Sequence, residues 1–319
     1  MQSGLIRRYK MVNNLKNFLL KYISLIGLLL LCLIIAMISP RFLTVSNILN
    51  VLTQVSVNAI LAIGMTFVIL TGGIDLSVGS VLAITGAVVA TFAKAGGNIL
   101  PGAIVTIALG AAIGLFNGLL VSKGKVQAFI VTLATMTIFR GVTYVFTDGN
   151  PISGLGDNIS FIGNKMLFGV PIPIYLILIV LLIAWYTLTQ TRFGRYVYAL
   201  GGNEDSARLS GINTNKIKTL VYVISGITAA IAGIIVTSRI GSASPNAGTG
   251  FELDAIAAVV LGGTSLAGGE GKITGTIIGA LIIGVLNNGL NLMGVSPFYQ
   301  SIAKGVVILL AVLMDKKEK

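Results

Sequence analysis

The sequence predicts an all-α, polytopic membrane protein with about ten transmembrane helices. Only 10% of its 319 residues are charged and 55% are hydrophobic, whereas soluble domains usually carry about 25% charged residues. The mean hydropathy of +0.95 indicates that lipid, and not water, surrounds much of the chain. Ten apolar runs, most of them close to the roughly 20 residues that cross a hydrocarbon core, explain this composition.

The apolar runs predict one transmembrane domain over residues 22–314, preceded by a segment 1–21 and followed by a tail 315–319. The run at 253–266 is short for a span and is a candidate re-entrant half-helix. The runs occupy residues 22–39, 48–70, 78–93, 99–121, 126–146, 172–189, 216–240, 253–266, 273–293 and 299–314.

The basic residues are distributed unevenly, and this predicts how the chain lies in the membrane. Placing the N-terminus inside puts sixteen of the 22 basic residues in or beside the cytoplasmic segments. A bacterial inner membrane protein with both termini cytoplasmic is therefore expected, and the formal charge of +12 needs no nucleic-acid partner. The sixteen are Arg7, Arg8, Lys10, Lys16, Lys21, Lys123, Lys125, Arg192, Arg195, Arg208, Lys216, Lys218, Lys272, Lys316, Lys317 and Lys319.

Six basic residues lie outside this pattern. Arg140 and Lys304 are about five residues from the outer ends of their spans, within snorkelling reach of water. The other four are expected on the outer side, where they are candidates for docking an extracytoplasmic partner. These are Arg41, Lys94, Lys165 and Arg239.

The composition argues against an enzyme and against a bound cofactor or metal. Histidine is absent and Cys32 is the only cysteine, so His-dependent triads and Cys-rich or imidazole metal sites are excluded. The one phosphate-loop-like stretch, 268–272, has Leu266 where the loop needs its first Gly and Ile273 where it needs Ser or Thr. If ATP drives this protein, another subunit must hold it.

Glycines spaced four residues apart predict close contact between helices. Each such ladder leaves a groove along one helix face, and helix packing is a better explanation for it than solute contact. The ladders are Gly110, Gly114 and Gly118, and Gly275 with Gly279.

A short cytoplasmic helix is predicted to begin after Asn203. This residue suits the N-cap, acidic residues follow in the first turn, and Gly211 suits the C-terminal end. So short a helix needs a docking surface, which is either the membrane face of the protein itself or a groove on a partner. The candidate coupling residues are Asn203, Glu204, Asp205, Ser206, Ala207, Arg208 and Gly211, with Ala207 and Leu209 offering apolar contact.

Two glycine-rich breaks interrupt the apolar runs, one in each half of the chain. Irregular backbone at membrane depth is tolerated only where protein or a water-filled cavity satisfies it, and paired breaks point to a central pathway. Asp75 is expected either at the cytoplasmic edge or facing that pathway. The candidate pathway residues in the breaks are Thr71, Gly72, Gly73, Asp75, Ser77, Gly262, Gly263, Thr264 and Ser265.

Asparagines in the run 273–293 are a third polar feature. Asn287 and Asn291 are one turn apart and share a helix face. They are candidates either for bonding neighbouring helices, which we favour, or for contacting a hydroxylated solute in the pathway.

Several of these segments together resemble the sugar-permease family of bacterial ATP-binding cassette (ABC) importers, and its ribose permeases in particular. The resemblance covers nearly the whole chain. It is carried by Gly72–Gly79 (GGIDLSVG), Gly201–Asn203 (GGN), Leu209–Asn213 (LSGIN), Asp254–Gly269 (DAIAAVVLGGTSLAGG) and Asn287–Leu292 (NNGLNL).

The resemblance implies a ten-helix importer permease fold that forms a homodimer and passes D-ribose inward. It also implies two cytoplasmic ATPase subunits or one fused tandem ATPase, an extracytoplasmic sugar-binding protein, and a coupling role for 203–211. The alternatives are a permease for another monosaccharide or autoinducer-2, an ion-coupled secondary transporter, and a membrane-embedded enzyme. The scarcity of charges within spans argues against the ion-coupled transporter. The lack of His and of clustered carboxylates argues against the membrane-embedded enzyme.

Overall fold

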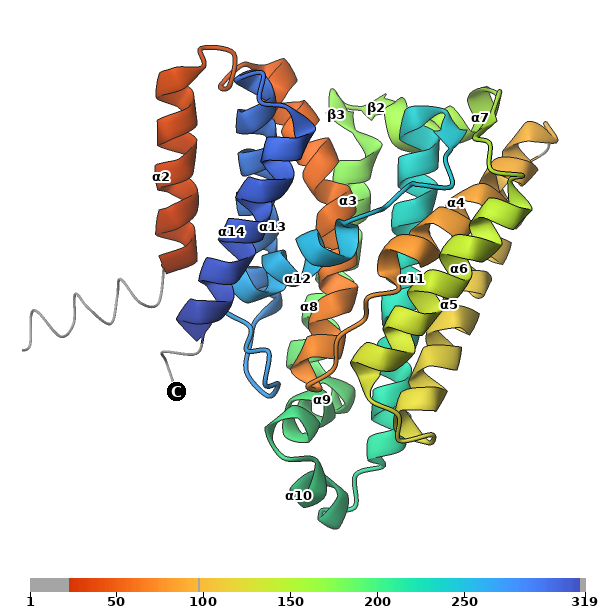
Figure 1. The fold of residues 1–319 in the computed structure, drawn as a ribbon, viewed down its shortest axis with the longest axis vertical. Helices are drawn as coiled ribbons and strands as arrows, with labels where there is room; N and C mark the ends of the chain where they lie inside the picture. The colour runs from red at the N-terminus through yellow and green to blue at the C-terminus, as the bar shows by residue number, and fades with distance from the viewer. Residues whose placement is uncertain (1–22, 97, 316–319) are drawn as a thin grey trace, which may run out of the picture.

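A computed structural model describes residues 23–96 and 98–315, and the described chain is predominantly helical (Figure 1). The predicted segment 1–21 and residues 316–319 of the predicted tail lie outside the described residues. Six helices are long and apolar enough to cross a membrane. They are α3 (Val45–Leu70), α5 (Ile99–Ser122), α6 (Ala128–Phe146), α8 (Ile172–Gln190), α11 (Thr214–Ile240) and α13 (Ile273–Leu292).

The other four apolar runs form helices whose apolar stretches are shorter. Three of them are α2 (Ile23–Ile38), α4 (Val78–Lys94) and α14 (Pro297–Asp315), each with an apolar stretch of 10 to 17 residues. The run at 253–266 forms α12 (Phe251–Leu261), which has only 11 residues. Since a helix rises about 1.5 Å per residue, α12 is too short to cross a hydrocarbon core, and it lies across the long helices of the bundle (Figure 1).

The two ends of the bundle carry different small elements. At one end lie α9 (Arg192–Gly202) and α10 (Glu204–Leu209), which follow α8. At the other end lies α7 (Asp157–Asn164) with two short two-stranded sheets (Figure 1). Strand β1 (Ile152–Ser153) pairs antiparallel with β4 (Ser242–Ala243), and β2 (Met166–Leu167) with β3 (Val170–Pro171).

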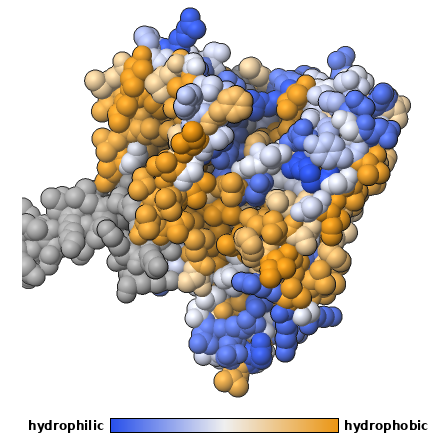
Figure 2. Space-filling model, viewed as in Figure 1, coloured by the Kyte–Doolittle hydropathy of each residue, from blue (hydrophilic) through white to orange (hydrophobic). Residues whose placement is uncertain are grey.

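Helices α3 and α11 form the centre of the bundle. In the most apolar stretch of α3, 83% of the residues are buried, against 22% in the corresponding stretches of α6 and α8. The outer helices therefore turn their apolar side chains to the surroundings of the bundle. Figure 2 shows this as a broad apolar surface that ends above the hydrophilic region of α9 and α10.

The predicted glycine ladders are packing surfaces. A Cβ atom added at Gly110, Gly114 or Gly118 would overlap backbone atoms of α11, and one at Gly279 would overlap the carbonyl of Ala258 in α12. Backbones can approach this closely only where no side chain separates them. The preference for helix packing over solute contact is confirmed at these positions.

Helices α3 and α11 are each followed by a break and a short helix, but they run in opposite directions. Helix α3 runs toward the α10 end, and the chain then turns back into the bundle through residues 71–77 to begin α4 (Figure 1). Helix α11 runs the other way, and residues 241–250 return into the bundle to begin α12. The two breaks thus enter the bundle from opposite ends.

We expect Gly114→Ala to destabilise the protein, because its methyl group would collide with the Tyr222 carbonyl oxygen and so push α5 from α11. Overpacking of this kind typically costs about 1–3 kcal/mol. Gly141→Ala in α6 is the matched control, since nothing lies within 4 Å of its added Cβ. Thermal unfolding of both variants in detergent measures the difference. Equal melting temperatures would show that the α5–α11 contact is looser than described.

Candidate functional site

The first break buries a carboxylate inside the bundle. Asp75 is 1% exposed. One carboxylate oxygen accepts hydrogen bonds from the backbone N–H of Ser77 at 3.0 Å and from the Ser77 hydroxyl at 2.6 Å. The other accepts from the Ser225 hydroxyl of α11 at 2.7 Å. A buried charge is tolerable when donors surround it, and the break supplies two of these three.

Further bonds tie this carboxylate to the neighbouring helices. Asn117 of α5 donates to the Ser77 hydroxyl at 2.9 Å and accepts from Thr135 of α6 at 2.7 Å. Thr132, also in α6, donates to the carbonyl of Ile74 at 3.2 Å. The break therefore joins α5, α6 and α11. Asp75 is expected at the cytoplasmic edge or facing a pathway; its carboxylate is enclosed by protein donors, and its depth in the membrane stays a prediction.

The second break is at residues 241–250 and is the partner of the first. Gly248 has a φ of +70° and its carbonyl lies so close to Gly79, at the start of α4, that neither position has room for a Cβ. The sequence had suggested 262–269 as the second break. Pro245 and the glycines at 241, 248 and 250 are the signals that point to the right place.

Arg140 holds the second break in place. One guanidinium nitrogen donates to the carbonyls of Pro245 and Ala247 at 2.6 and 2.8 Å. Its neighbour Tyr144, one turn along α6, bonds Asn246. The expected snorkelling of Arg140 is therefore wrong, because the guanidinium satisfies backbone carbonyls that a membrane cannot hydrate.

Lys304 does not snorkel to water either. Its amino group lies 3.0 Å from the carboxylate of Asp254, which is almost fully buried in α12. The pair joins α14 to the half-helix. Removing one partner would leave the other charge buried and unpaired, which is costly.

The second break also leaves a polar surface between apolar ones. Asn246 and Thr249 are exposed, and Glu252 is half-buried beside them. Figure 2 shows hydrophilic residues gathered between apolar surfaces on this face of the molecule. Irregular backbone and exposed amides are not found against lipid, so this face requires water or protein over it.

The loop 262–271 lies at the α10 end and not at the centre of the bundle, which corrects its expected place in the pathway. The backbone N–H of Gly269 donates to the carbonyl of Leu70, the last residue of α3, at 3.0 Å. A Cβ at Gly201, in the last turn of α9, would collide with that same carbonyl. We call this meeting of Leu70, Gly201 and Gly269 the glycine junction. Through it α9 is in direct contact with α3 and with the loop before α13.

The remaining residues of this loop have local roles. Ser265 accepts from the backbone N–H of Ala267 through its hydroxyl, and its own N–H donates to the carbonyl of Glu270. The Thr264 hydroxyl is buried beside Gly271 without a hydrogen-bond partner. Gly262 packs against the backbone of Gly275.

Of the two candidate asparagines of α13, Asn291 bonds another helix, as favoured, and Asn288 does so too, whereas no such bond is described for Asn287. Asn288 exchanges two hydrogen bonds with Asn47 of α3, at 2.9 and 3.0 Å. Asn291 accepts from Gln300 of α14 at 2.7 Å. Asn287 keeps a buried carbonyl oxygen without a partner. These residues lie near the end of α13 far from α10, so the structure separates them from residues 71–77.

Helix α10 has the predicted caps. The Asn203 side chain accepts from the backbone N–H of Ser206 at 2.8 Å, and Gly211 has a φ of +83°. Glu204 is 2.6 Å from the amino group of Lys218 in α11 and 3.2 Å from the guanidinium of Arg208. Burial alone would raise the pKa of the Glu204 carboxyl, but the hydrogen bond and charge of Lys218, with Arg208, lower the pKa below its ordinary value.

One part of the prediction for α10 is wrong. Ala207 is buried against the chain itself, so it offers no contact to a partner, whereas Leu209 is 90% exposed. Residues on one helix face are three or four positions apart, whereas Ala207 and Leu209 are two positions apart and so lie on opposite faces of α10. The apolar side chain available for docking on α10 is therefore Leu209.

The four candidate docking cations share the end of the bundle opposite α10. Arg41 follows α2, Lys94 ends α4, Lys165 follows α7, and Arg239 lies in the last turn of α11. Arg239 donates to the Asn50 side chain at 3.5 Å, and Lys165 lies 5.0 Å from the centre of the Phe161 ring. Within residues 23–96 and 98–315, no group of three or more His, Cys, Asp or Glu side chains is placed to hold a metal ion.

Comparison with known proteins places this arrangement in one family. The family model of the branched-chain amino acid transport system / permease component matches residues 47–312. The chain is 58% identical over 308 residues to the ribose import permease protein of Escherichia coli (strain K12), covering 95% of this chain and 96% of that one. It is 54% identical over 295 residues to the ribose import permease protein of Bacillus subtilis (strain 168), covering 92% of each.

A relative named for another sugar is less similar. The D-allose transport system permease protein of Escherichia coli (strain K12) is 43% identical over 299 residues, covering 93% of this chain and 91% of that one. No solved structure matches.

We expect Asp75→Ala to lower the stability of the fold, because the donors of Ser77 and Ser225 would lose their acceptor in a dry site. An unsatisfied buried donor costs about 1–3 kcal/mol. Asp205→Ala is the control, since the Asp205 side chain is 89% exposed. Thermal unfolding in detergent compares the two variants. An unchanged melting temperature for Asp75→Ala would mean that the bonds around this carboxylate contribute nothing net.

Proposed function

Because the chain belongs to the branched-chain amino acid transport system / permease component family, we propose that it is the membrane permease subunit of an ABC importer for D-ribose. The identity of 54–58% to ribose import permease proteins, over nearly the whole chain, carries this assignment. The lower identity to the D-allose relative favours ribose over that hexose. The protein is a transport component and makes or breaks no covalent bond.

The driving ATPase is a separate cytoplasmic subunit that binds at α10. The caps of Asn203 and Gly211 keep this six-residue helix rigid, and the ion pair of Glu204 with Lys218 fastens it to α11. Movement of α10 passes through α9 to the glycine junction, and from there to the end of α3 and the loop before α13. Since residues 71–77 follow α3 directly, the stroke reaches both breaks in the bundle.

The α10 end faces the cytoplasm and the α7 end faces outward. Basic side chains of the described cytoplasmic segments, such as Lys123, Arg192 and Lys272, lie at the α10 end, as the positive-inside rule requires. Helix α2 begins and α14 ends toward this side (Figure 1), which supports cytoplasmic termini in a bacterial inner membrane. The four cations of the opposite end then meet an acidic-faced sugar-binding protein.

A second copy of the permease covers the polar face of the second break. Lipid cannot satisfy Asn246, Thr249 and the backbone between them. Two copies facing each other would enclose these groups, and the sugar would pass between them beside Glu252 and Arg140. The alternative of an ion-coupled carrier has less support, because the charges described at membrane depth are held in bonds to carbonyls, hydroxyls or each other.

The test is uptake of radiolabelled ribose by Escherichia coli K12 that lacks its own ribose import permease and produces this chain. Restored uptake, with excess unlabelled D-allose or D-xylose competing weakly, is the expected result. In reconstituted vesicles that hold the permease, the ATPase and the binding protein, ribose uptake should require ATP and should not be abolished by ionophores. Uptake that needs an ion gradient and no ATPase would instead establish a secondary transporter.

We expect Leu209→Asp to impair ribose uptake at least severalfold while the permease still inserts, because the exposed apolar contact of α10 would become charged. Leu209→Met is the matched control, because it keeps an exposed apolar side chain at the same position. Uptake and ATP hydrolysis are measured together in vesicles holding the complete importer. Normal coupling in Leu209→Asp would exclude this side chain from the ATPase contact.

A further inference from the structure

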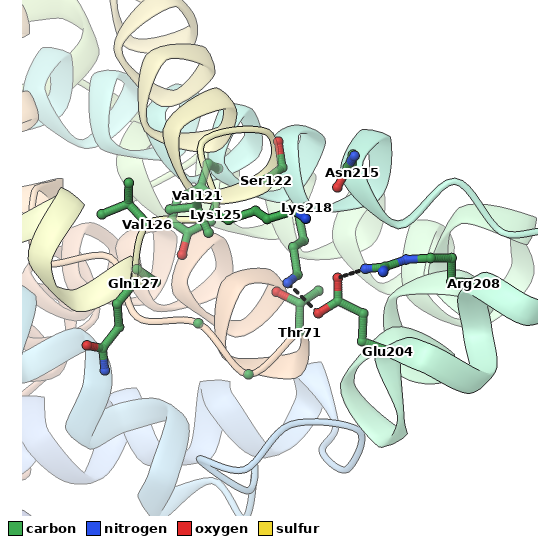
Figure 3. Close-up of a pocket in the computed structure, with 14 residues that line it drawn as sticks. Thr71, Val121, Ser122, Lys125, Val126, Gln127, Glu204, Arg208, Asn215 and Lys218 are labelled. Atoms are coloured by element: carbon green, nitrogen blue, oxygen red, sulfur yellow. Dashed lines mark hydrogen bonds and ion pairs between the residues drawn. The ribbon is translucent and has the colours of Figure 1, made fainter.

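A cavity of about 430 Å³ lies at the α10 end of the bundle, beneath the first break (Figure 3). Its walls come from four places in the chain. The turn after α3 contributes Thr71–Gly73, and the loop between α5 and α6 contributes residues 125–127. Helix α10 and the start of α11 close the other side. A volume of this size suits a small organic ligand better than a single ion.

The charges of the cavity favour an anion. Three basic side chains line it, Lys125, Arg208 and Lys218, against one carboxylate, Glu204. Glu204 is already engaged by both Lys218 and Arg208 (Figure 3). Lys125 makes no ion pair within the described chain. A neutral sugar would leave this excess of positive charge uncompensated, whereas phosphate is a preferred partner of Lys and Arg.

The neutral groups of the cavity favour a polyhydroxylated ligand. The side-chain amides of Gln127 and Asn215 form no hydrogen bond to another described residue. At the inner end, the Tyr222 hydroxyl is buried against Gly73 and has no hydrogen-bond partner. Buried hydroxyls are normally paired, so the unpaired Tyr222 hydroxyl marks the inner end of the cavity as a place that lacks a hydrogen-bond partner.

We propose that this cavity binds a small phosphorylated sugar, whose phosphate is held by Lys125 and whose hydroxyls are held by the neutral side chains. The inference rests on the proposed function, which places the cavity on the cytoplasmic side. Phosphoryl transfer to the imported sugar is the class of reaction that would produce such a ligand. The ligand would therefore report that imported sugar has been converted.

Binding at this place opposes transport. The cavity lies between α10 and the turn after α3, so a ligand that contacts both fixes the distance between them. The ATPase stroke proposed above changes that distance through the glycine junction. A ligand that binds only one of the two arrangements shifts the population toward that arrangement. Because the coupling is reciprocal, the ATPase-driven movement in turn lowers the affinity for the ligand.

The binding test uses purified full-length permease and three probes: ribose 5-phosphate, inorganic phosphate and ribose. We expect ribose 5-phosphate to bind saturably in calorimetry, at least tenfold more tightly than inorganic phosphate or ribose. Lys125→Gln should weaken this binding about tenfold or more, since a hydrogen bond to a charged group is lost, and Lys125→Arg should retain it. Lys123→Gln is the control, because Lys123 is exposed and does not line the cavity.

The transport test encloses ribose 5-phosphate with ATP on the ATPase side of vesicles holding the complete importer. Ribose uptake should fall in the parent and in Lys123→Gln, and persist in Lys125→Gln. Equal inhibition of all three, or no saturable binding, would overturn the proposal. Equal affinity for inorganic phosphate would overturn the assignment of a sugar. Ribose uptake measured without ribose 5-phosphate tests the proposed transport function separately.

Discussion

The fold depends on satisfying broken backbone in a region without water. Each unpaired N–H or C=O at membrane depth costs several kcal/mol, and this chain places two irregular segments inside its bundle. Arg140 serves the carbonyls of Pro245 and Ala247, and Thr132 serves that of Ile74. Asp75 accepts from the amide of Ser77. The polar residues of the interior are therefore in large part the partners of the breaks.

The glycines follow from the same constraint. The breaks cross at Gly79 and Gly248, and the long helices α5 and α11 meet along the ladder of Gly110 and Gly114. Without side chains at these positions, the backbone itself forms the contact surface. Such contacts are rigid, because backbone atoms cannot change rotamer as side chains do.

This rigidity links the α10 end to the interior. The glycine junction joins the last turn of α9 to the carbonyl that ends α3, and the cavity lies beside it between α10 and the same turn. Both features act on residues 71–73, which lead directly to Asp75 and its network. The ATPase contact and the ligand that we propose would therefore both act on the segment 71–77, which carries Asp75 and its hydrogen bonds.

The sequence by itself determined the membrane class, the family resemblance and the short capped helix, because each depends on local composition or spacing. Asn203 and the backbone amide of Ser206 that it bonds are three residues apart, so both lie within one helical turn. The partners of Asp75 were different, since Ser225 is 150 residues away. Only the tertiary structure showed that the second break is at 241–250 and not at 262–269. It also showed that Ala207 is buried and that Gly201 contacts Leu70. In each case the physical reason is that burial and backbone contact between distant segments depend on how the helices pack, which no local pattern encodes.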